Sequence, residues 1–152
     1  MLPALSMNIC ITQYSDTAHR AGVIALWDAV FGHRGAHNKP SLAINKKLEV
    51  ADGLFFVAIL DQKVIGSVMA GYDGHRGWIY SVAVSPAHRR KGTGSQLIRF
   101  AERALVNKGC MKVNLQIMEG NETVIAFYNK LGFEVEKRIS MGKPLNQNIP
   151  PA

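Results

Sequence analysis

Arg89-Arg90-Lys91-Gly92-Thr93-Gly94 is the stretch of this 152-residue sequence that decides the fold. It lies between an apolar run, residues 79–84, and an amphipathic helical pattern that begins near Ser95. Glycine lets the backbone adopt positive φ and approach a ligand closely, and the first N–H groups of a helix point outward with the positive end of its dipole. A strand, a basic glycine turn and a helix start therefore predict an anion cradle that suits a pyrophosphate.

The glycine spacing of this stretch separates it from two familiar phosphate-binding motifs. The phosphate loop of nucleotide hydrolases needs four residues between its glycines and then Gly-Lys-Ser/Thr, and the dinucleotide fingerprint needs three glycines. Arg89-x-x-Gly92-x-Gly94 is neither of these. A plain solvated basic turn is the alternative, and the helix start that follows favours phosphate binding.

Two linked blocks resemble the GNAT acetyltransferase superfamily. Val82-Ala83-Val84 followed by Arg89-x-x-Gly92-x-Gly94 resembles its acyl-CoA pyrophosphate loop, and Asn121 with Ala126-Phe127-Tyr128-x-x-Leu131-Gly132-Phe133 resembles its later helix and strand. Residues 71–77 resemble the YpeA-like bacterial branch. The resemblance covers residues 9–145. It implies acetyl-CoA as co-substrate and direct acetyl transfer to a primary amine in a ternary complex, with no metal.

The resemblance also implies which residues hold the coenzyme. The pantetheine arm would lie between two splayed strands, residues 78–84 and 112–117, with backbone amides facing the thioester. Asn121 has two compatible roles, as a helix cap and as a polar contact to the pantetheine. The residues expected to bind acetyl-CoA are Val82, Ala83, Val84, Arg89, Arg90, Lys91, Gly92, Thr93, Gly94, Ser95, Asn121 and Tyr128.

Tyr128 matches the family tyrosine that lies near the CoA sulfur and acts as general acid. A phenol titrates near pH 10, so it can donate a proton at neutral pH. The helical spacing alone favours a core aromatic on one stripe with Val124 and Leu131. Within the second block, the catalytic role becomes the better prediction.

The resemblance does not identify a general base in this sequence. Relatives often place a glutamate at the two strand positions occupied here by Trp78 and Gln116. We predict Glu119, near the end of its strand, as the base. Asp73, His75, or Tyr80 acting through water, are the alternatives, although Asp73-Gly74 and a lone histidine are also typical of turns and surfaces.

The order of the expected elements predicts an α+β fold with helices on both faces of a sheet. The resemblance implies the same architecture, a GNAT-like fold with a mixed, mostly antiparallel central sheet. Three consecutive strands form a meander rather than the alternation of a doubly wound sheet. Ser15 and Ser41 are candidate caps of the first two helices, and Asn121 caps the last. The strands are expected at residues 9–11, 54–60, 64–70, 78–84, 112–117 and within 133–141.

Length and composition predict one domain over residues 8–145, with residues 1–7 and 146–152 as flexible termini. Cys10 and Cys110 lack metal-site spacing and are expected to be reduced thiols. The longest apolar run has seven residues, too short for a bilayer, and residues 1–6 lack a secretion signal. The sequence therefore predicts a cytoplasmic protein without a membrane partner.

The formal charge of +7 allows an acidic ligand, a membrane surface or nucleic acid. The densest basic cluster, residues 88–91, lies in the proposed cradle, and Lys46-Lys47 and Lys137-Arg138 are expected to be scattered surface charges. No interleaved aromatic pattern indicates a nucleic-acid groove, so we expect no nucleic-acid partner.

The acceptor is expected to be a primary amine of a small molecule, peptide or protein. Its pocket would come from the loops at residues 31–40 and 140–145, beside Trp27 and Phe31, where His33, Arg34 and His37 could bind an acidic group. A homodimer is possible, because the last strands often pair between subunits in relatives. Two other hypotheses stay open: a catalytically silent acyl-CoA-binding or sensing module, and a basic nucleic-acid-binding protein.

Overall fold

The computed structural model describes residues 8–32 and 39–146, and the chain divides into two compact units at Gln116/Ile117. Each unit is described by itself. Along the chain the elements are β1 (Cys10–Gln13), α1 (Asp16–Phe31), α2 (Pro40–Val50), β2 (Phe55–Leu60), β3 (Lys63–Tyr72), β4 (Gly77–Val84), the short 3₁₀ turn η2 (Pro86–His88), α3 (Thr93–Asn107), β5 (Val113–Leu115) and α4 (Glu122–Lys130). No helix of the described ranges is long and apolar enough to cross a bilayer.

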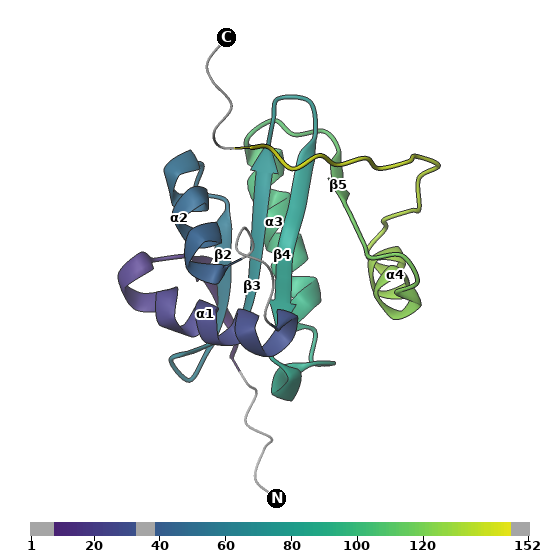
Figure 1. Ribbon diagram of the computed structural model, residues 1–152. Coiled ribbons are helices and arrows are strands. Elements are labelled where there is room, and N and C mark those ends of the chain that lie inside the picture. The colour runs from purple at the N-terminus through teal and green to yellow at the C-terminus, as the bar shows by residue number, and fades with distance from the viewer. Residues whose placement is uncertain (1–7, 33–38, 147–152) are drawn as a thin grey trace, which may run out of the picture. The chain divides into compact units, whose positions relative to one another are not determined.

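The first unit is a five-stranded sheet with helices on both faces. Its strands lie in sequence order, β1 to β4 antiparallel, with β5 parallel to β4. Helices α1 and α2 cover one face and α3 the other (Figure 1). Under α1 and α2 the core includes Trp27, Ile44, Phe55 and Met69, all nearly inaccessible. The predicted α+β class and mixed, mostly antiparallel sheet are confirmed.

Helix α3 packs closely on the sheet because two strand glycines leave room for it. Its apolar stripe is almost completely buried and consists of Leu97, Ile98, Ala101 and Leu105. A Cβ added at Gly66 would lie 2.8 Å from Leu97 Cδ1, and one at Gly77 would lie 3.0 Å from Leu105 Cδ1. This packing holds α3 against the face of β3 and β4.

Two predicted helix starts and one predicted capping bond need correction. Ser15 is the N-cap residue of α1, but its side chain makes no capping hydrogen bond. Helix α2 begins at Pro40 with Lys39 as its N-cap residue, so Ser41 is not the cap; proline suits the first turn because its missing N–H has no helical acceptor there. Helix α3 begins at Thr93, two residues before the predicted start.

The prediction of strands within residues 133–141 is wrong. None of these residues lies in a strand, and Val135, Ile139 and Met141 are exposed. A strand forms only against a neighbouring strand, and the sheet of the described chain ends at β5. The weak alternation of apolar and polar residues in this segment therefore does not indicate a strand.

Candidate active site

The β4–α3 junction joins a strand, a basic glycine turn and a helix start, in the order that the sequence predicts. Arg90 and Gly92 have φ values of 63° and 81°, and Gly92 is the N-cap residue of α3. The first intrahelical bond runs from Gln96 N–H to the Gly92 carbonyl, at 3.0 Å. The N–H groups of residues 93–95 precede that bond and so have no partner within the helix. They form a set of outward-facing donors at the positive end of the helix dipole.

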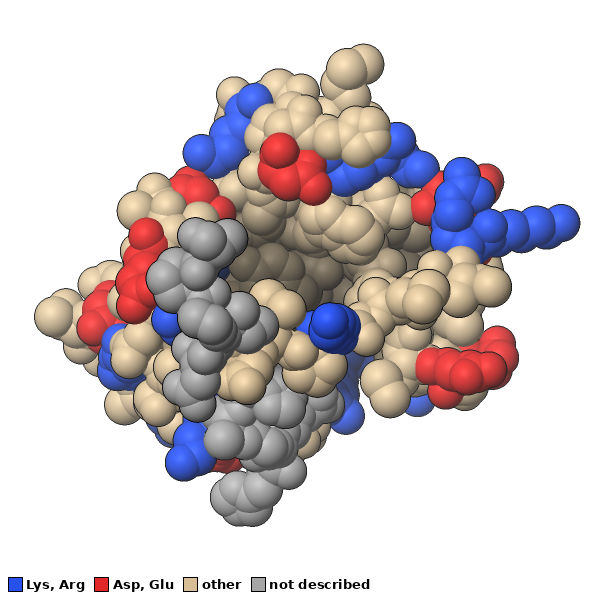
Figure 2. Space-filling view, turned by 45° about the horizontal axis from the view of Figure 1, so that its top comes forward, with Lys and Arg blue, Asp and Glu red and all other residues tan. Residues whose placement is uncertain are grey.

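The charge around this helix start is uncompensated. Helix α3 has no acidic residue in its first turn, and Arg89, Arg90 and Lys91 are exposed. Within residues 8–32 and 39–146, the recorded ion pairs join other residues. Elsewhere basic and acidic side chains are interspersed, as one face shows (Figure 2). The concentrated positive charge therefore coincides with the free N–H groups.

Two buried polar atoms at the junction have no hydrogen-bond partner. These are Thr93 Oγ1, on a residue only 1% exposed, and His88 Nδ1. Burying a hydroxyl without a partner costs free energy, so such atoms usually face a ligand or an ordered water. The orphaned hydroxyl lies on the first residue of α3, where an anion would bind.

Strand β4 carries a bulge just before the junction. Ser67 pairs with Ala83 and Met69 with Tyr80, so Ser81 and Val82 together oppose Val68 of β3. Ser81 has a φ of 51°, in the left-handed region. A bulge leaves its extra residue out of the hydrogen-bond ladder, and backbone groups become available to a ligand.

The pairing between β4 and β5 ends close to this bulge. They pair from Gly77 to Ile79 against Val113 to Leu115, but β4 continues to Val84. Beyond Ile79, the β5-facing edge of β4 therefore has no β5 partner. The pairing of the two strands therefore ends within the region where the sequence predicts a splay.

In the second unit, α4 holds Tyr128 in an aromatic cluster. Asn121 Oδ1 accepts a bond from Val124 N–H at 3.3 Å, so its predicted capping role is confirmed. Tyr128 is 8% exposed, with the rings of Phe127 and Phe133 at 4.9 and 5.5 Å. Burial raises the pKa of Tyr128 to about 12. The phenol is therefore a proton donor throughout the neutral range.

The candidate bases differ in their surroundings. Asp73 accepts the N–H groups of His75 and Arg76 at 2.7 Å each, and these bonds, that to Arg76 first, lower the pKa of its carboxyl. This supports a turn-forming role for Asp73 and makes it a weak base. Glu119 is exposed in the second unit, and Tyr80 is 41% exposed on β4 of the first.

The structure brings the predicted residues together in two groups. Residues 82–84 and 89–95 lie around the β4–α3 junction of the first unit, while Glu119, Asn121 and Tyr128 belong to the second. Of the predicted acceptor residues, His33, Arg34 and His37 lie outside the described residues. Trp27 is buried in the core, and Phe31 ends α1.

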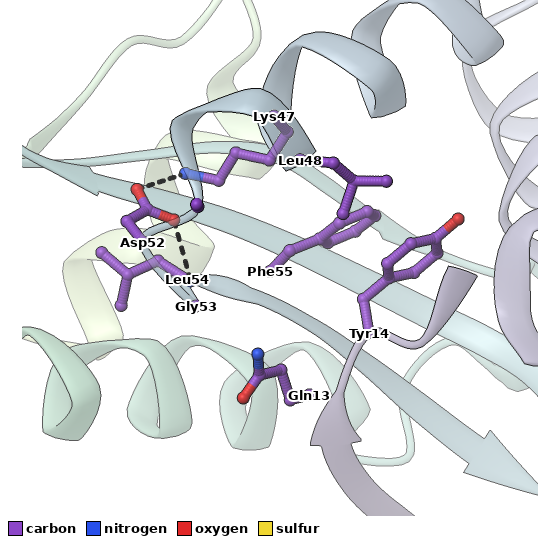
Figure 3. A pocket seen from close by; sticks show the side chains of 9 residues that line it. Gln13, Tyr14, Lys47, Leu48, Asp52, Gly53, Leu54 and Phe55 are labelled. Atoms are coloured by element: carbon purple, nitrogen blue, oxygen red, sulfur yellow. Dashed lines mark hydrogen bonds and ion pairs between the residues drawn. The ribbon is translucent and has the colours of Figure 1, made fainter. Parts of the chain in front are cut away.

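Sequence analysis missed the role of Lys47, which it placed among scattered surface charges. The side chain is 4% exposed, and its Nζ lies 2.8 Å from Asp52 Oδ2 (Figure 3). Nζ also donates to the Ala70 carbonyl and lies 5.4 Å from the Tyr80 ring centroid. The signal was available, because Lys47 follows the buried Ile44 by three residues on one helix face.

The Lys47–Asp52 pair lies at the wall of a pocket of ≈ 450 Å³. The end of β1, the end of α2 and the start of β2 form this pocket (Figure 3). Asp52 Oδ1 accepts Leu54 N–H at 3.0 Å, so both carboxylate oxygens have partners. The pair therefore fixes the loop between α2 and β2.

The chain is similar to known acetyltransferases along most of its length. The model of the acetyltransferase (GNAT) family matches residues 21–133. An acetyltransferase of Yersinia pestis (strain Pestoides F) is 40% identical over 139 residues, covering 91% of this chain and 96% of the relative. An acetyltransferase of Pectobacterium atrosepticum is 41% identical over 123 residues, covering 81% and 86%.

Two solved structures share the fold. The aminoglycoside N-acetyltransferase AAC(6')-Iy in complex with CoA has a TM-score of 0.77 at 24% identity and covers 94% of this chain and 99% of its own. The PaiA N-acetyltransferase of Thermoplasma acidophilum, in complex with coenzyme A, has a TM-score of 0.76 at 20% identity and covers 88% and 94%. The chain therefore belongs to the acetyltransferase (GNAT) family, and it is an acyltransferase that takes its acetyl group from acetyl-CoA.

Proposed function

We propose that the main-chain N–H groups of residues 90–95 bind the diphosphate of acetyl-CoA. The observation that carries this proposal is the start of α3, with free N–H groups, no acidic residue and an orphaned hydroxyl on Thr93. Arg89, Arg90 and Lys91 add charge that a diphosphate would neutralise. The same stretch in the family's pyrophosphate loop supports the assignment.

The thioester would lie against the bulge of β4. Val82 lies in the bulge, and Ala83 and Val84 pair with β3 again just beyond it. Beyond Ile79, the edge of β4 that has no β5 partner would give the pantetheine arm a path. An N–H group at the thioester oxygen would stabilise the charge that develops in the transition state. Asn121 would contact the pantetheine in addition to capping α4.

The reaction then needs one acid and one base. The amine nitrogen attacks the thioester carbonyl carbon, and the C–S bond breaks when the tetrahedral intermediate collapses. Tyr128 donates its proton to the departing thiolate sulfur, and Glu119 accepts the proton that the amine nitrogen loses. No covalent enzyme intermediate is formed.

Thr93→Val is expected to change stability and coenzyme binding in opposite directions. Removing the orphaned hydroxyl should leave the unliganded protein as stable as wild type or more so, because a buried unpaired group is lost. It should weaken CoA binding about tenfold or more, because a hydrogen bond to a charged group contributes about 1.5–3 kcal/mol. Thermal melts without ligand and calorimetric titration with CoA measure the two effects. Unchanged CoA affinity would remove Thr93 from the site.

Glu119→Gln is expected to lower kcat/KM about threefold to tenfold and to remove the acidic limb of its pH profile. The loss is below the usual range for a base because water can replace an exposed carboxylate. Asp73→Asn is the matched control, since its amide oxygen can still accept the two turn N–H groups. An acidic limb that survives Glu119→Gln but disappears in Asp73→Asn would reverse the assignment.

The acceptor is proposed to be a small-molecule primary amine. The similar AAC(6')-Iy is an aminoglycoside N-acetyltransferase, and its structure with a CoA–acetylneamine bisubstrate analogue places an amine acceptor on this fold. Peptide and protein amines are the second class. We further propose that residues 8–145 act as one catalytic domain, because the match to the family spans residues 21–133 and so includes parts of both units.

An amine panel with acetyl-CoA tests this function. CoA thiol release stimulated by small amines, with the acetylated amine identified by mass spectrometry, is the expected result. Stimulation only by peptides would move the acceptor to the second class. Coenzyme binding without stimulation by any amine would favour the acyl-CoA-sensing alternative.

A further inference from the structure

A buried hydrogen-bond chain connects helix α1 to the bulge of β4. Trp27 Nε1–H donates to Ser67 Oγ at 2.8 Å, and the Ser67 hydroxyl donates to the Ser81 carbonyl at 3.1 Å. Trp27 is 4% exposed and Ser67 is fully buried. The single hydroxyl of Ser67 thus uses both its acceptor and its donor capacity between two other elements.

The hydrogen-bond chain ends at the carbonyl of Ser81, a residue of the β4 bulge. Ser81 has a φ of 51°, which costs a non-glycine residue about 1–2 kcal/mol. Such a conformation persists only where surrounding contacts hold it. The bond from Ser67, on the adjacent strand, is a contact made to the strained peptide itself.

The peptide plane transmits this contact to Val82. The Ser81 carbonyl and the Val82 N–H belong to one planar trans peptide and therefore point in opposite directions. With the carbonyl held toward Ser67, the Val82 N–H is directed away from Ser67. The orientation of that N–H is thus set by a side chain on β3 and an indole on α1.

We infer that Trp27 and Ser67 are positioning residues for acetyl transfer, which aim the Val82 N–H at the thioester oxygen of acetyl-CoA. This inference rests on the proposed place of the thioester at residues 82–84. Trp27 and Ser67 themselves do not touch the substrate. Their contribution is to preorganise a donor, so they act on turnover more than on binding of the coenzyme.

Ser67→Ala removes only the hydroxyl, and Trp27→Phe removes the indole N–H together with part of the buried ring. Each variant is expected to lower kcat about threefold to tenfold, below the loss of a whole oxyanion donor, while the CoA dissociation constant stays within about twofold. The double variant should lose no more than the worse single variant, since the links act in series. Val23→Ala is the control: Val23 lies fully buried in the same core cluster and has no polar group. It should lose stability and keep kcat.

Two results would overturn the inference. One is wild-type kcat in both Ser67→Ala and Trp27→Phe; the other is a loss of kcat in Val23→Ala equal to theirs, which would reduce the chain to a structural role. Amide NMR separates this failure from that of the proposed function. We expect the Val82 N–H resonance to differ between the CoA and acetyl-CoA complexes, and to move in Ser67→Ala. If wild type binds both coenzymes and this resonance is identical in the two complexes, the thioester does not lie at residues 82–84. Both that proposed place of the thioester and the positioning role of Trp27 and Ser67 would then be wrong.

Discussion

Tyr128→Phe is expected to lower kcat about tenfold to a hundredfold and to leave acetyl-CoA affinity largely unchanged. Phenylalanine keeps the ring that packs against Phe127 and Phe133, so only the proton donor is lost. If Tyr128 were simply a core aromatic, the substitution would be nearly neutral. Steady-state kinetics with a saturating amine, together with CoA titration, measure both quantities.

The pH dependence gives a second test of Tyr128. Because burial raises its pKa to about 12, the phenol stays protonated through the range in which the enzyme can be assayed. Loss of its proton therefore cannot produce a basic limb below about pH 10. Wild-type kcat in Tyr128→Phe would remove Tyr128 from the mechanism.

Lys47→Met is expected to lower the free energy of unfolding by about 3–5 kcal/mol, the usual cost of removing one partner of a buried ion pair. The Asp52 carboxylate, whose side chain is 20% exposed, would lose its cation, and the Ala70 carbonyl would lose a buried donor. The Tyr80 ring would lose its cation contact as well. Urea denaturation followed by circular dichroism measures the change.

The adjacent Lys46 provides a matched control. Its pair with Glu49 spans 3.8 Å between side chains that are 68% and 69% exposed, so Lys46→Met should cost about 0.5 kcal/mol or less. Adding Asp52→Asn to Lys47→Met should recover part of the loss, because the buried charge goes while an acceptor for Leu54 N–H remains. Equal unfolding midpoints for Lys46→Met and Lys47→Met would show that Lys47 does not stabilise the α2–β2 loop.

Sequence patterns predicted the features that local signals encode. Gly92, the basic run before it and the stripe of α3 predicted the turn between β4 and α3 and placed the helix start within two residues. The meander of β2, β3 and β4 followed from turn residues such as Asp73-Gly74. These signals lie within a few residues of the structure they produce.

Features that depend on distant contacts were missed or wrong. The β4 bulge lies at Ser81, a residue type with no strong preference for positive φ, and is held by Ser67 and Trp27 from other elements. Lys47 is buried against Asp52 and the Ala70 carbonyl. The sequence around Lys47 does not show that these two partners lie beside it. The strands expected within residues 133–141 did not form, because alternation without a neighbouring strand does not make a sheet.

Capping residues show a similar division. Asn121 caps α4 through its side chain as predicted, whereas Ser15 only occupies the N-cap position of α1. At Ser15 the backbone N–H instead donates to His19 Nδ1 at 2.9 Å. Residue type therefore predicted where α1 begins without predicting which bond forms there.

Calorimetric titration of the folded protein with CoA and with pantetheine tests the central claim most directly, since the two ligands differ by the diphosphate and nucleotide. We expect one CoA to bind per chain, and pantetheine to bind at least about tenfold more weakly, because it lacks the charged acceptors for the N–H groups at the start of α3. No heat from CoA at millimolar concentration, or equal affinity for the two ligands, would contradict the account.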